Sequence, residues 1–575
     1  MSRGSSNEYD VVVVGLGPTG LTLAHLLGRR GLRTLVLERE PEFYGNARAV
    51  YTDDEALRVF QTAGVADDIH EDMNVDSTVQ WVREDGSVLV QFRTPDRPLW
   101  WPVTNFLYQP YMETKLEALL ERYPHVEVRR GHEVLDFAQG SDGVSITHAP
   151  STGSGYGKRE NAVDISASQT VRAAYLIGAD GGRSVVRTKL GIDMTGKTYS
   201  ERWLVVDLAA KEAPDGGHSD AFRHLPYFDF ICNPDMPTVS CPQPGGHHRF
   251  EFELKDGDVK EEFESDQTVH RLIGQYVDVD EVEVRRKLVY TFNACTADRW
   301  RSGRVLLAGD AAHMTPQFVG QGMNAGVRDA DNLSWKLEAI LRHGADPAIL
   351  DTYETERKSH ATAMIALSVF NKSLVSVKNP VKARARDLAL TTAIHAPGLG
   401  SWVRRAGMKP KPRFKKETYL GLPRGPRGIE GTLPPQPVVR RYDGRPIRLD
   451  DALGIGWALL GVGVDPRDGD DLAIWDQVAA SYATLYGPGT RPQGTIGDGR
   501  RRTGLIDIED TTGELTRWLR HHGIRPGSVV ALRPDKYVFG VAPVGDPTLG
   551  RALASQLGVA RSIRPAVSAD REWVG

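Results

Sequence analysis

Residues 9–38 read YDVVVVGLGPTGLTLAHLLGRRGLRTLVLE, and this stretch predicts the fold. Tyr9–Val14 is a strand-length run of mostly β-branched residues, Leu21–Arg30 has a helical pattern, and Arg33–Glu38 is a second strand-like run. The motif GLGPTG, residues 15–20, stands between the first strand and the helix and matches GxGxxG. This βαβ unit, with an acidic residue ending its second strand, predicts a dinucleotide-binding fold.

The residue types of this unit suit a dinucleotide. Glycines permit a tight turn and a close approach of the backbone to a pyrophosphate, and the helix N-terminus offers free N–H groups to it. Glu38 can accept hydrogen bonds from ribose hydroxyls. A glycine-rich turn that binds nothing is the alternative, and the motif alone does not distinguish FAD from NAD. The residues that we assign to the cofactor here are Gly15, Gly17, Pro18, Thr19, Gly20, Glu38 and Arg39.

Two further motifs follow strand-like runs farther along the chain. GADGGRSVVR, residues 178–187, comes after AYLI. GDAAH, residues 309–313, comes after VLLA, and Pro316 and GQGMN, residues 320–324, follow it at the start of a long helical pattern. Asp310 ends a strand-like run, where its two carboxylate oxygens can accept from ribose or ribitol hydroxyls.

Together the three motifs resemble the group A flavoprotein monooxygenases, the aromatic hydroxylases with a para-hydroxybenzoate-hydroxylase-like fold. The resemblance implies that the first motif binds the ADP part of FAD, that the second contacts flavin and nicotinamide nucleotide, and that the third binds the ribityl chain and flavin ring. The N–H groups of the helix at residues 320–324 would face the pyrimidine edge of the ring. For Asp180 and Asp310 the alternative is a turn aspartate that bonds its own backbone. The residues assigned to the cofactor here are Asp180, Gly181, Asp310, Pro316, Gly320, Gly322, Met323 and Asn324.

Three more polar residues have an open role. Arg48 and Gln109 stand where the family has a flavin-contacting arginine and glutamine. For Arg48 the alternative is a surface ion pair, which is what a lone arginine usually makes. His313 is either packed beside its loop or takes part in catalysis. The sequence identifies no catalytic base.

The resemblance extends over nearly the whole chain. NPDMPT at residues 233–238, RFEF at 249–252 and WKL at 335–337 resemble the 3-(3-hydroxyphenyl)propionate hydroxylase branch. RPDKYV at residues 533–538 resembles the tail of the phenol hydroxylases, a thioredoxin-like domain. The sequence has no CxxC pair there, so we expect packing and dimer contacts rather than redox work from this domain.

We therefore expect an α/β chain with a Rossmann-like FAD-binding domain, an inserted antiparallel-sheet substrate domain and a C-terminal thioredoxin-like domain. Short strands separated by Pro/Gly turns fill residues 199–292, and residues 421–437 form a Gly/Pro-rich connector. The expected boundaries are residues 1–198 for the FAD-binding domain, with some substrate-domain strands within 75–110, then 199–298 for the substrate domain, 299–427 for the FAD-binding continuation and helical linker, and 428–575 for the thioredoxin-like domain.

Composition narrows the class of protein. The 575 residues are 25% charged with a formal net charge of −4, which suggests neither a nucleic-acid partner nor an anionic membrane. The three cysteines are irregularly spaced, so neither a disulfide framework nor a metal site is expected. The polar start and the absence of a long apolar run favour a cytoplasmic protein without a membrane anchor.

The resemblance implies an FAD-dependent monooxygenase that uses NAD(P)H and O2 to hydroxylate a phenol-like or polyketide-like aromatic molecule through a C4a-hydroperoxyflavin. A flavoprotein oxidase or dehydrogenase, or a Baeyer–Villiger-type enzyme, is the alternative on the same fold. A halogenase lacks support because Leu204 and Val205 follow Trp203 where a WxWxIP signature would be needed, and a non-catalytic nucleotide-binding regulator would need only the first motif. Two aromatic clusters either pack in the core or line a pocket over the flavin: Trp100, Trp101, Phe106 and Tyr108, and Phe222, Tyr227, Phe228 and Phe230.

Overall fold

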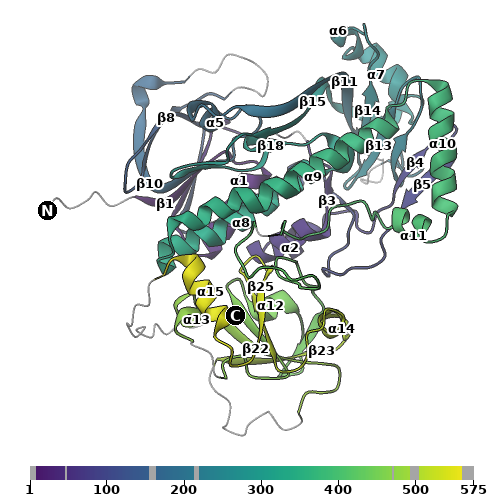
Figure 1. The fold of residues 1–575 in the computed structure, drawn as a ribbon. Coiled ribbons are helices and arrows are strands. Elements are labelled where there is room, and N and C mark those ends of the chain that lie inside the picture. The colour runs from purple at the N-terminus through teal and green to yellow at the C-terminus, as the bar shows by residue number, and fades with distance from the viewer. Residues whose placement is uncertain are drawn as a thin grey trace. The chain divides into compact units, whose positions relative to one another are not determined.

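A computed structural model describes residues 8–43, 45, 48–153, 163–212, 219–416, 418–468, 472–492 and 504–559. The chain divides into two compact units (Figure 1). Unit 1 comprises Met1–Arg97, Trp101–Asp331 and Arg357–Lys411, and unit 2 comprises Pro98–Trp100, Asn332–Glu356 and Pro412–Gly575. The fold is a mixed α/β fold with several sheets.

The first sheet of unit 1 carries the βαβ unit. Its strand order is β16-β17-β10-β1-β2-β7, and β17, β10, β1, β2 and β7 are mutually parallel. Val11, Val12 and Val13 are fully buried, as expected for a parallel sheet that is covered on both faces. The strands are β1 (Tyr9–Val14), β2 (Thr34–Glu38), β7 (Val126–Arg130), β8 (His132–Gln139), β9 (Val144–Pro150), β10 (Gln169–Gly178), β16 (Arg301–Ser302) and β17 (Val305–Leu307), with β8 and β9 attached through β10.

The helix after β1 begins three residues earlier than the sequence pattern indicated. Helix α1 spans Pro18–Arg29, with Pro18 at its first turn. Proline suits that position because its fixed φ is helical and its missing N–H would have no intrahelical partner there.

The second sheet of unit 1 is mainly antiparallel, with the order β18-β15-β11-β14-β13-β12-β4-β5 and one parallel pair, β12 with β4. Successive side chains along its strands point to opposite faces, so that one face packs on helix α7 (Asp266–Ile273) and the other carries Trp81, Trp203, Phe230 and Phe292. The strands are β4 (Val79–Val82), β5 (Val88–Phe92), β11 (Met194–Ala210), β12 (Phe228–Ile231), β13 (Thr238–Gln243), β14 (His247–Glu253), β15 (Val282–Ala297) and β18 (His313–Met314).

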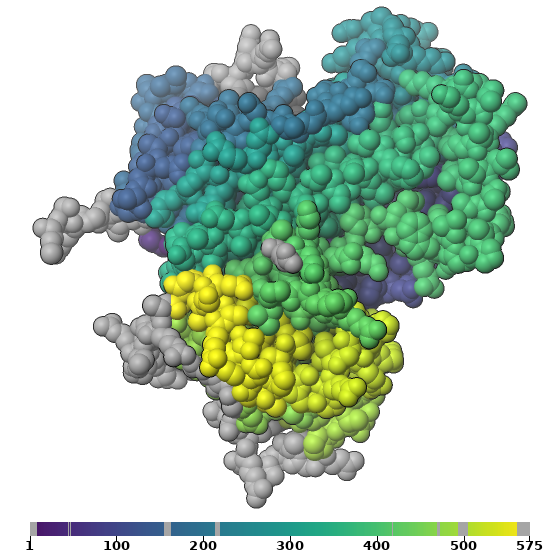
Figure 2. Space-filling view, in the orientation of Figure 1, coloured from purple at the N-terminus to yellow at the C-terminus, as the bar shows by residue number. Residues whose placement is uncertain are grey.

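Helices and two short strands complete unit 1. Helices α10 (Pro380–His395) and α11 (Leu399–Arg404) lie at its surface, in the green part of the space-filling view (Figure 2). Val381 and Leu388 of α10 are exposed. Helices α8 and α9 contribute residues to both units. The elements are β3 (Tyr51–Thr52), β6 (Asn105–Phe106), α2 (Asp54–Ala63), α3 (Ala66–His70), α4 (Gln109–Leu119), α5 (Val185–Lys189), α6 (Lys260–Phe263), α7 (Asp266–Ile273), α8 (Gln321–His343), α9 (Asp351–Val375), α10 (Pro380–His395) and α11 (Leu399–Arg404), with 3-10 turns at Leu120–Arg122, Ile165–Ala167, Val279–Glu281, Gly309–Ala311 and Gln317–Val319. A further 3-10 turn, Pro347–Leu350, belongs to unit 2.

Unit 2 has its own sheet, in the order β20-β19-β23-β22-β21-β24-β25. Strands β21, β22 and β23 are parallel neighbours, and β24 and β25 continue antiparallel from β21. A buried ion network stabilises this unit, in which Arg533 contacts Glu356 at 2.7 Å and Asp535 at 2.6 Å. The elements are β19 (Val438–Arg441), β20 (Pro446–Arg448), α12 (Leu449–Leu453), β21 (Ala458–Val462), α13 (Ala473–Gln477), β22 (Ser481–Tyr486), β23 (Leu505–Asp510), α14 (Glu514–His521), β24 (Ser528–Leu532), β25 (Val538–Pro543) and α15 (Thr548–Leu557).

None of the helices that the structure describes has an apolar stretch long enough to span a bilayer.

Candidate active site

The three motifs meet at one edge of the parallel sheet. Gly15 follows β1, Ala179 follows β10 and Gly309 follows β17, and these three strands are neighbours in the sheet. Gly15 has φ +100°, and a Cβ there would lie 2.5 Å from the carbonyl oxygen of Ala179. A Cβ on Gly309 would lie 2.6 Å from Oγ1 of Thr19. Only glycine allows these approaches, which bring the first motif against the second and the third.

Thr19 and Gly20 also lie in this closely packed region. A Cβ on Gly20 would collide with the carbonyl oxygen of Gly15, and one on Gly326 in helix α8 would collide with Oγ1 of Thr19. Thr19 therefore lies between Gly309 and Gly326. The start of α1 and the start of α8 are held close together in this way.

Other glycines of the motifs face open space. Gly181 and Gly322 have no atom of the described chain within 4 Å of an added Cβ, and Gly17 has only Nη2 of Arg48, at 4.0 Å. Gly17 precedes α1 and Gly322 is in the first turn of α8. Open space beside the backbone at two helix N-termini on one sheet edge fits a dinucleotide, whose phosphates and ring edge accept hydrogen bonds from N–H groups.

The three acidic residues at the strand ends differ in their contacts. Glu38 accepts from the backbone N–H of Leu16 at 2.8 Å and of Glu40 at 3.0 Å, so it ties β2 to the first turn. Oδ2 of Asp180 accepts from the N–H groups of Val185 and Val186, while Oδ1 is buried and has no partner among the described residues. Burial raises the pKa of Asp180.

Asp310 makes no such local bonds. It is half-buried in the turn Gly309–Ala311, and its carboxylate accepts no hydrogen bond from any residue that the structure describes. The alternative of a turn aspartate bonded to its own backbone thus fits one oxygen of Asp180 and does not fit Asp310. Arg39 is half-buried beside Glu38, with Nε 3.4 Å from Glu40.

The backbone at Arg48 is held from two sides. Oε1 of Gln109, at the start of α4, accepts from the N–H of Arg48 at 2.7 Å and of Ala49 at 2.5 Å. Nη1 of Arg249 donates to the carbonyl oxygen of Arg48 at 2.7 Å, and Arg249 is itself paired with Asp207 at 2.6 Å. The Arg48 side chain is exposed near Gly17, whereas Gln109 is buried. Asn46 and Ala47, which precede Arg48, lie outside the described residues.

Pro316, Gly320 and Asn324 hold the third loop. The carbonyl oxygen of Pro316 accepts from Ser368 at 2.7 Å. Nδ2 of the buried Asn324 donates to the carbonyl oxygen of Gly320 at 2.8 Å, and its Oδ1 accepts from Thr52 at 3.0 Å. The side chain of Asn324 is therefore occupied by the protein, while Gly322 and Met323 stay half-buried on the first turn of α8.

His313 is a packed histidine with a buried partner. Its Nε2 lies 2.6 Å from Oδ2 of Asp329, which also accepts from the N–H of Gly309 at 3.1 Å. Arg357 donates to the other oxygen of Asp329 at 2.9 Å. Burial alone would raise the pKa of Asp329, but His313 and Arg357 outweigh it and lower that pKa to about 2. Neither Asp329 nor Arg357 stood out in the sequence, since each lies within a helical pattern.

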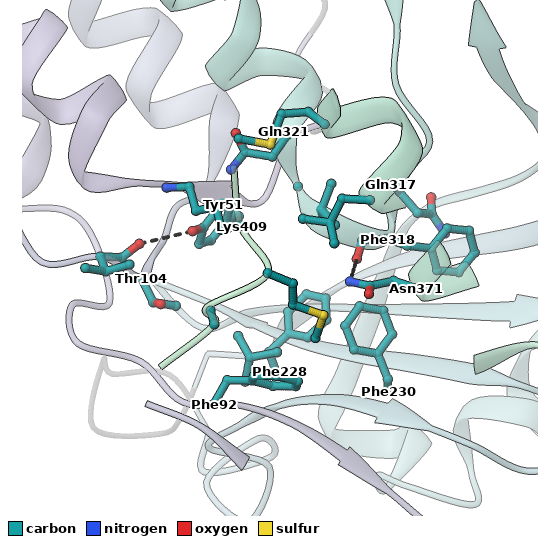
Figure 3. A pocket seen from close by; sticks show the side chains of 18 of the residues that line it. Tyr51, Phe92, Thr104, Phe228, Phe230, Gln317, Phe318, Gln321, Asn371 and Lys409 are labelled. Carbon is teal, nitrogen blue, oxygen red and sulfur yellow. Dashed lines mark hydrogen bonds between the residues drawn. The ribbon is translucent and has the colours of Figure 1, made fainter. Parts of the chain in front are cut away.

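A cavity of about 170 Å³ lies next to the third loop in unit 1 (Figure 3). Phe106, Phe228 and Phe230 of the two aromatic clusters line it. The others do not: Trp101 is buried and donates to Gln61, Tyr108 stacks on His247, Phe222 stacks on His248, and Trp100 and Tyr227 are exposed. The lining residues are Val50, Tyr51, Val79, Trp81, Phe92, Thr94, Val103, Thr104, Phe106, Phe228, Phe230, Gln317, Phe318, Val319, Gly320, Gln321, Met364, Leu367, Asn371, Ala406, Met408 and Lys409.

A buried ion network borders this cavity and was not predicted. Asp53, Asp54 and Glu55 stand at the start of α2, where Asp53 caps the helix by accepting from the N–H of Ala56 at 2.9 Å. Arg328 lies 2.5 Å from Asp53, and Lys409 lies 2.9 Å from the same carboxylate. The acidic residues before a helical pattern are a recognisable N-capping signal in the sequence. Their partners, Arg328 and Lys409, lie far away in the sequence, so the network itself could not be predicted.

Comparisons with known proteins agree with this geometry. The family description "FAD binding domain" matches residues 8–368, and "HcaD C-terminal domain" matches residues 431–556. A 3-(3-hydroxy-phenyl)propionate/3-hydroxycinnamic acid hydroxylase of Burkholderia vietnamiensis is 34% identical over 94% of this chain and 94% of its own length. One from a Mycobacterium species is 36% identical over 93% of this chain and 89% of its own length.

Solved structures with the same fold include two hydroxylases. OxyS anhydrotetracycline hydroxylase from Streptomyces rimosus is 26% identical with a TM-score of 0.71, over 96% of this chain and 99% of its own. Aklavinone-11 hydroxylase, solved with FAD and aklavinone, has a TM-score of 0.72 at 24% identity, over 96% of this chain and 100% of its own.

Proposed function

Because the chain belongs to the family of FAD-dependent aromatic hydroxylases, we propose that its three motifs hold FAD and that the adjoining cavity holds the aromatic substrate. The chain is a flavin-dependent monooxygenase of the 3-(3-hydroxyphenyl)propionate hydroxylase branch. The observation that carries the assignment of the site is that Gly320 and Gln321 belong both to the third motif and to the cavity wall.

The residue roles in this proposal follow from their contacts. The open backbone at Gly17 and the start of α1 receives the pyrophosphate, with Gly15, Pro18, Thr19 and Gly20 shaping that turn. Glu38 and Arg39 meet the adenosine end. Asp310 accepts from the ribityl hydroxyls, which is supported by the fact that its carboxylate accepts no hydrogen bond from the residues that the structure describes. Arg48, Asp180 and Gly181, together with residues 320–324 of the third loop, surround the ring.

Bound FAD supplies the redox chemistry that activates dioxygen for attack on an electron-rich ring. The chain's own residues orient the ring and keep water away: the cavity wall is formed mainly by aromatic and aliphatic side chains. The use of NAD(P)H and O2 as co-substrates, a cytoplasmic location and a homodimer stay predictions.

The domain boundaries also stay part of the proposal. We assign residues 1–198 and 299–427 to FAD binding, 199–298 to the substrate sheet, and 428–575 to a thioredoxin-like domain. The strand order β22-β21-β24-β25, with β21 and β22 parallel, supports the last assignment.

The test is oxidation of NADH and NADPH by the purified yellow protein against a panel of phenols and polyketide-like aromatics, with product masses measured. A product heavier by one oxygen atom is expected. Oxidation without oxygen gain would favour an oxidase or dehydrogenase, and a ring-expanded lactone would favour the Baeyer–Villiger alternative.

A further inference from the structure

We propose that the cavity of unit 1 selects a neutral aromatic substrate over one that carries a carboxylate, and that Gln317 and Asn371 recognise a hydroxyl group on it. This inference rests on the proposed function, because it names the substrate class of the same site. It also separates this chain from relatives whose names specify a propionate or a cinnamic acid.

The cavity offers no uncommitted cation. Among the described lining residues, Lys409 carries the only formal charge. Its Nζ lies 2.9 Å from Asp53, 3.3 Å from Glu55 and 3.5 Å from Asp54. An ammonium group has three N–H donors, and three carboxylates already surround this one.

The wider ion network does not attract an anion either. Arg328, the second cation, lies 2.5 Å from Asp53 and 3.0 Å from Glu55. The carboxyl groups of Asp53 and Glu55 face the two cations. Burial raises the pKa of Asp54 to about 6, so Asp54 adds a negative charge above that pH. A substrate carboxylate would therefore lose its water shell next to a neutral or negative cluster, which is unfavourable.

The wall does offer one unpaired donor and one unpaired acceptor. Nε2 of Gln317 and Oδ1 of Asn371 are buried and have no hydrogen-bond partner within the described chain. The other end of the Asn371 amide donates to the carbonyl oxygen of Phe318 at 3.3 Å, which fixes its orientation (Figure 3). A phenolic hydroxyl both donates and accepts, so it can satisfy such groups without carrying a charge.

The remaining surface suits a flat ring. Phe106 and Phe228 are stacked with centroids 5.3 Å apart, and Phe228 and Phe230 are 4.9 Å apart. Trp81 and Phe92 make an edge contact at 5.5 Å on the same wall. Offset and edge contacts of this kind favour an aromatic guest.

The test is calorimetric titration of the FAD-loaded protein with two probes of equal shape, 3-(3-hydroxyphenyl)propionamide and 3-(3-hydroxyphenyl)propionate. The amide should bind at least about tenfold more tightly. Equal or tighter binding of the propionate would overturn the inference. If the product mass then showed that the propionate is hydroxylated, the proposed function would still hold. If neither probe bound, the assignment of the cavity would fail together with the inference.

Variants test the charge argument and the hydroxyl argument separately. Met408→Lys adds a cation to the wall and should shift the preference toward the propionate at least about tenfold, whereas Met408→Gln should not. The parent protein should bind 3-(3-hydroxyphenyl)propionamide more tightly than 3-phenylpropionamide. Gln317→Leu and Asn371→Leu should each reduce this difference in affinity. The comparison uses variants whose flavin content equals that of the parent protein. The inference would be contradicted if Met408→Lys kept the parent's ratio of affinities for the amide and the propionate. It would also be contradicted if both leucine variants kept the parent's ratio of affinities for the two amides.

Discussion

Asp310 and Glu38 are acidic residues at the ends of two strands of one sheet, yet only Glu38 is bonded to nearby backbone. Asp310 lies where the three motifs meet, and its carboxylate accepts no hydrogen bond within the described part of the chain, so its oxygens can accept from a ligand. Glu38, in contrast, already shapes the turn that precedes α1.

Replacing Asp310 with Ala should therefore weaken FAD binding more than replacing Glu38 with Ala. A buried charge-assisted hydrogen bond is worth about 1.5–3 kcal/mol, and losing it should release most of the flavin during purification. The measurement is FAD per chain after denaturation, which should be about one and non-covalent in the parent protein. Equal flavin content in the parent and the Asp310 variant would refute the assignment.

Glu113 gives a pH-dependent prediction. It accepts from Gln109 at 2.6 Å, and burial raises its pKa from 4.5 to about 7. A raised carboxyl pKa means that folding favours the protonated form. Its stabilising contribution is thus complete below about pH 4.5 and is lost as the pH rises through about 7.

Replacing Glu113 with Gln should remove this loss. Relative to the parent, the variant should gain up to about 3 kcal/mol in the free energy of unfolding between pH 5 and pH 8, at about 1.4 kcal/mol per pKa unit. Urea denaturation at both pH values measures the difference. Burial also raises the pKa of Glu251 to about 7, but both proteins contain Glu251, so its contribution to the free energy of unfolding is the same in each and does not affect their difference. A constant difference across this range would show that Glu113 stays ionised.

At the scale of elements, the packing of α1 against α8 depends on small residues that the sequence pattern did not connect. Thr19 was predicted to contact the cofactor, and the structure also places it between Gly309 and Gly326. Two helix N-termini can approach one ligand only if such residues let them come close.

Gly326→Ala should therefore destabilise the protein by about 1–3 kcal/mol, the usual cost of overpacking. Thr19→Ala should relieve much of that cost, because it removes the Oγ1 that the new methyl group meets. Thermal unfolding of the two single variants and the double variant measures the coupling. Additive effects would contradict the contact.

Periodicity and glycine spacing predicted the elements that hold the motifs, because strand, turn and helix signals are local. Such local patterns could not predict ion pairs between segments that are far apart in the sequence. Examples are Lys409 with Asp53, and Arg357 with Asp329. The hydrogen bonds from Gln109 and Arg249 to the backbone of Arg48 also join segments far apart in the sequence, and the sequence pattern did not indicate them. The sequence also did not show which aromatic residues line the cavity, because an aromatic residue in the core and one in a pocket wall have the same sequence pattern.

At the scale of the whole molecule, the sheet edge where the three motifs meet, the aromatic cavity and the ion network of Asp53 all belong to unit 1. A substrate in the cavity would touch Gly320, beside the open first turn of α8. Substrate binding and the position of the flavin ring can therefore be coupled.

We expect stopped-flow absorbance to show flavin reduction by NADH or NADPH that is slow alone and at least about tenfold faster with the true substrate, a coupling of about 1.4 kcal/mol. At Gly181 and Gly322 an added Cβ would meet no atom of the described residues within 4 Å, which leaves room for the ring to shift. Reduction that is equally fast without an aromatic compound would argue against this gating.

The most direct test of the central claim is the origin of the oxygen in the product. The FAD-loaded protein is given NADH or NADPH, an aromatic substrate identified by the screen and ¹⁸O-labelled dioxygen, and the product is analysed by mass spectrometry. A monooxygenase predicts a product that contains one labelled oxygen atom. An oxidised product with no label, formed with stoichiometric hydrogen peroxide, would contradict the account and identify an oxidase.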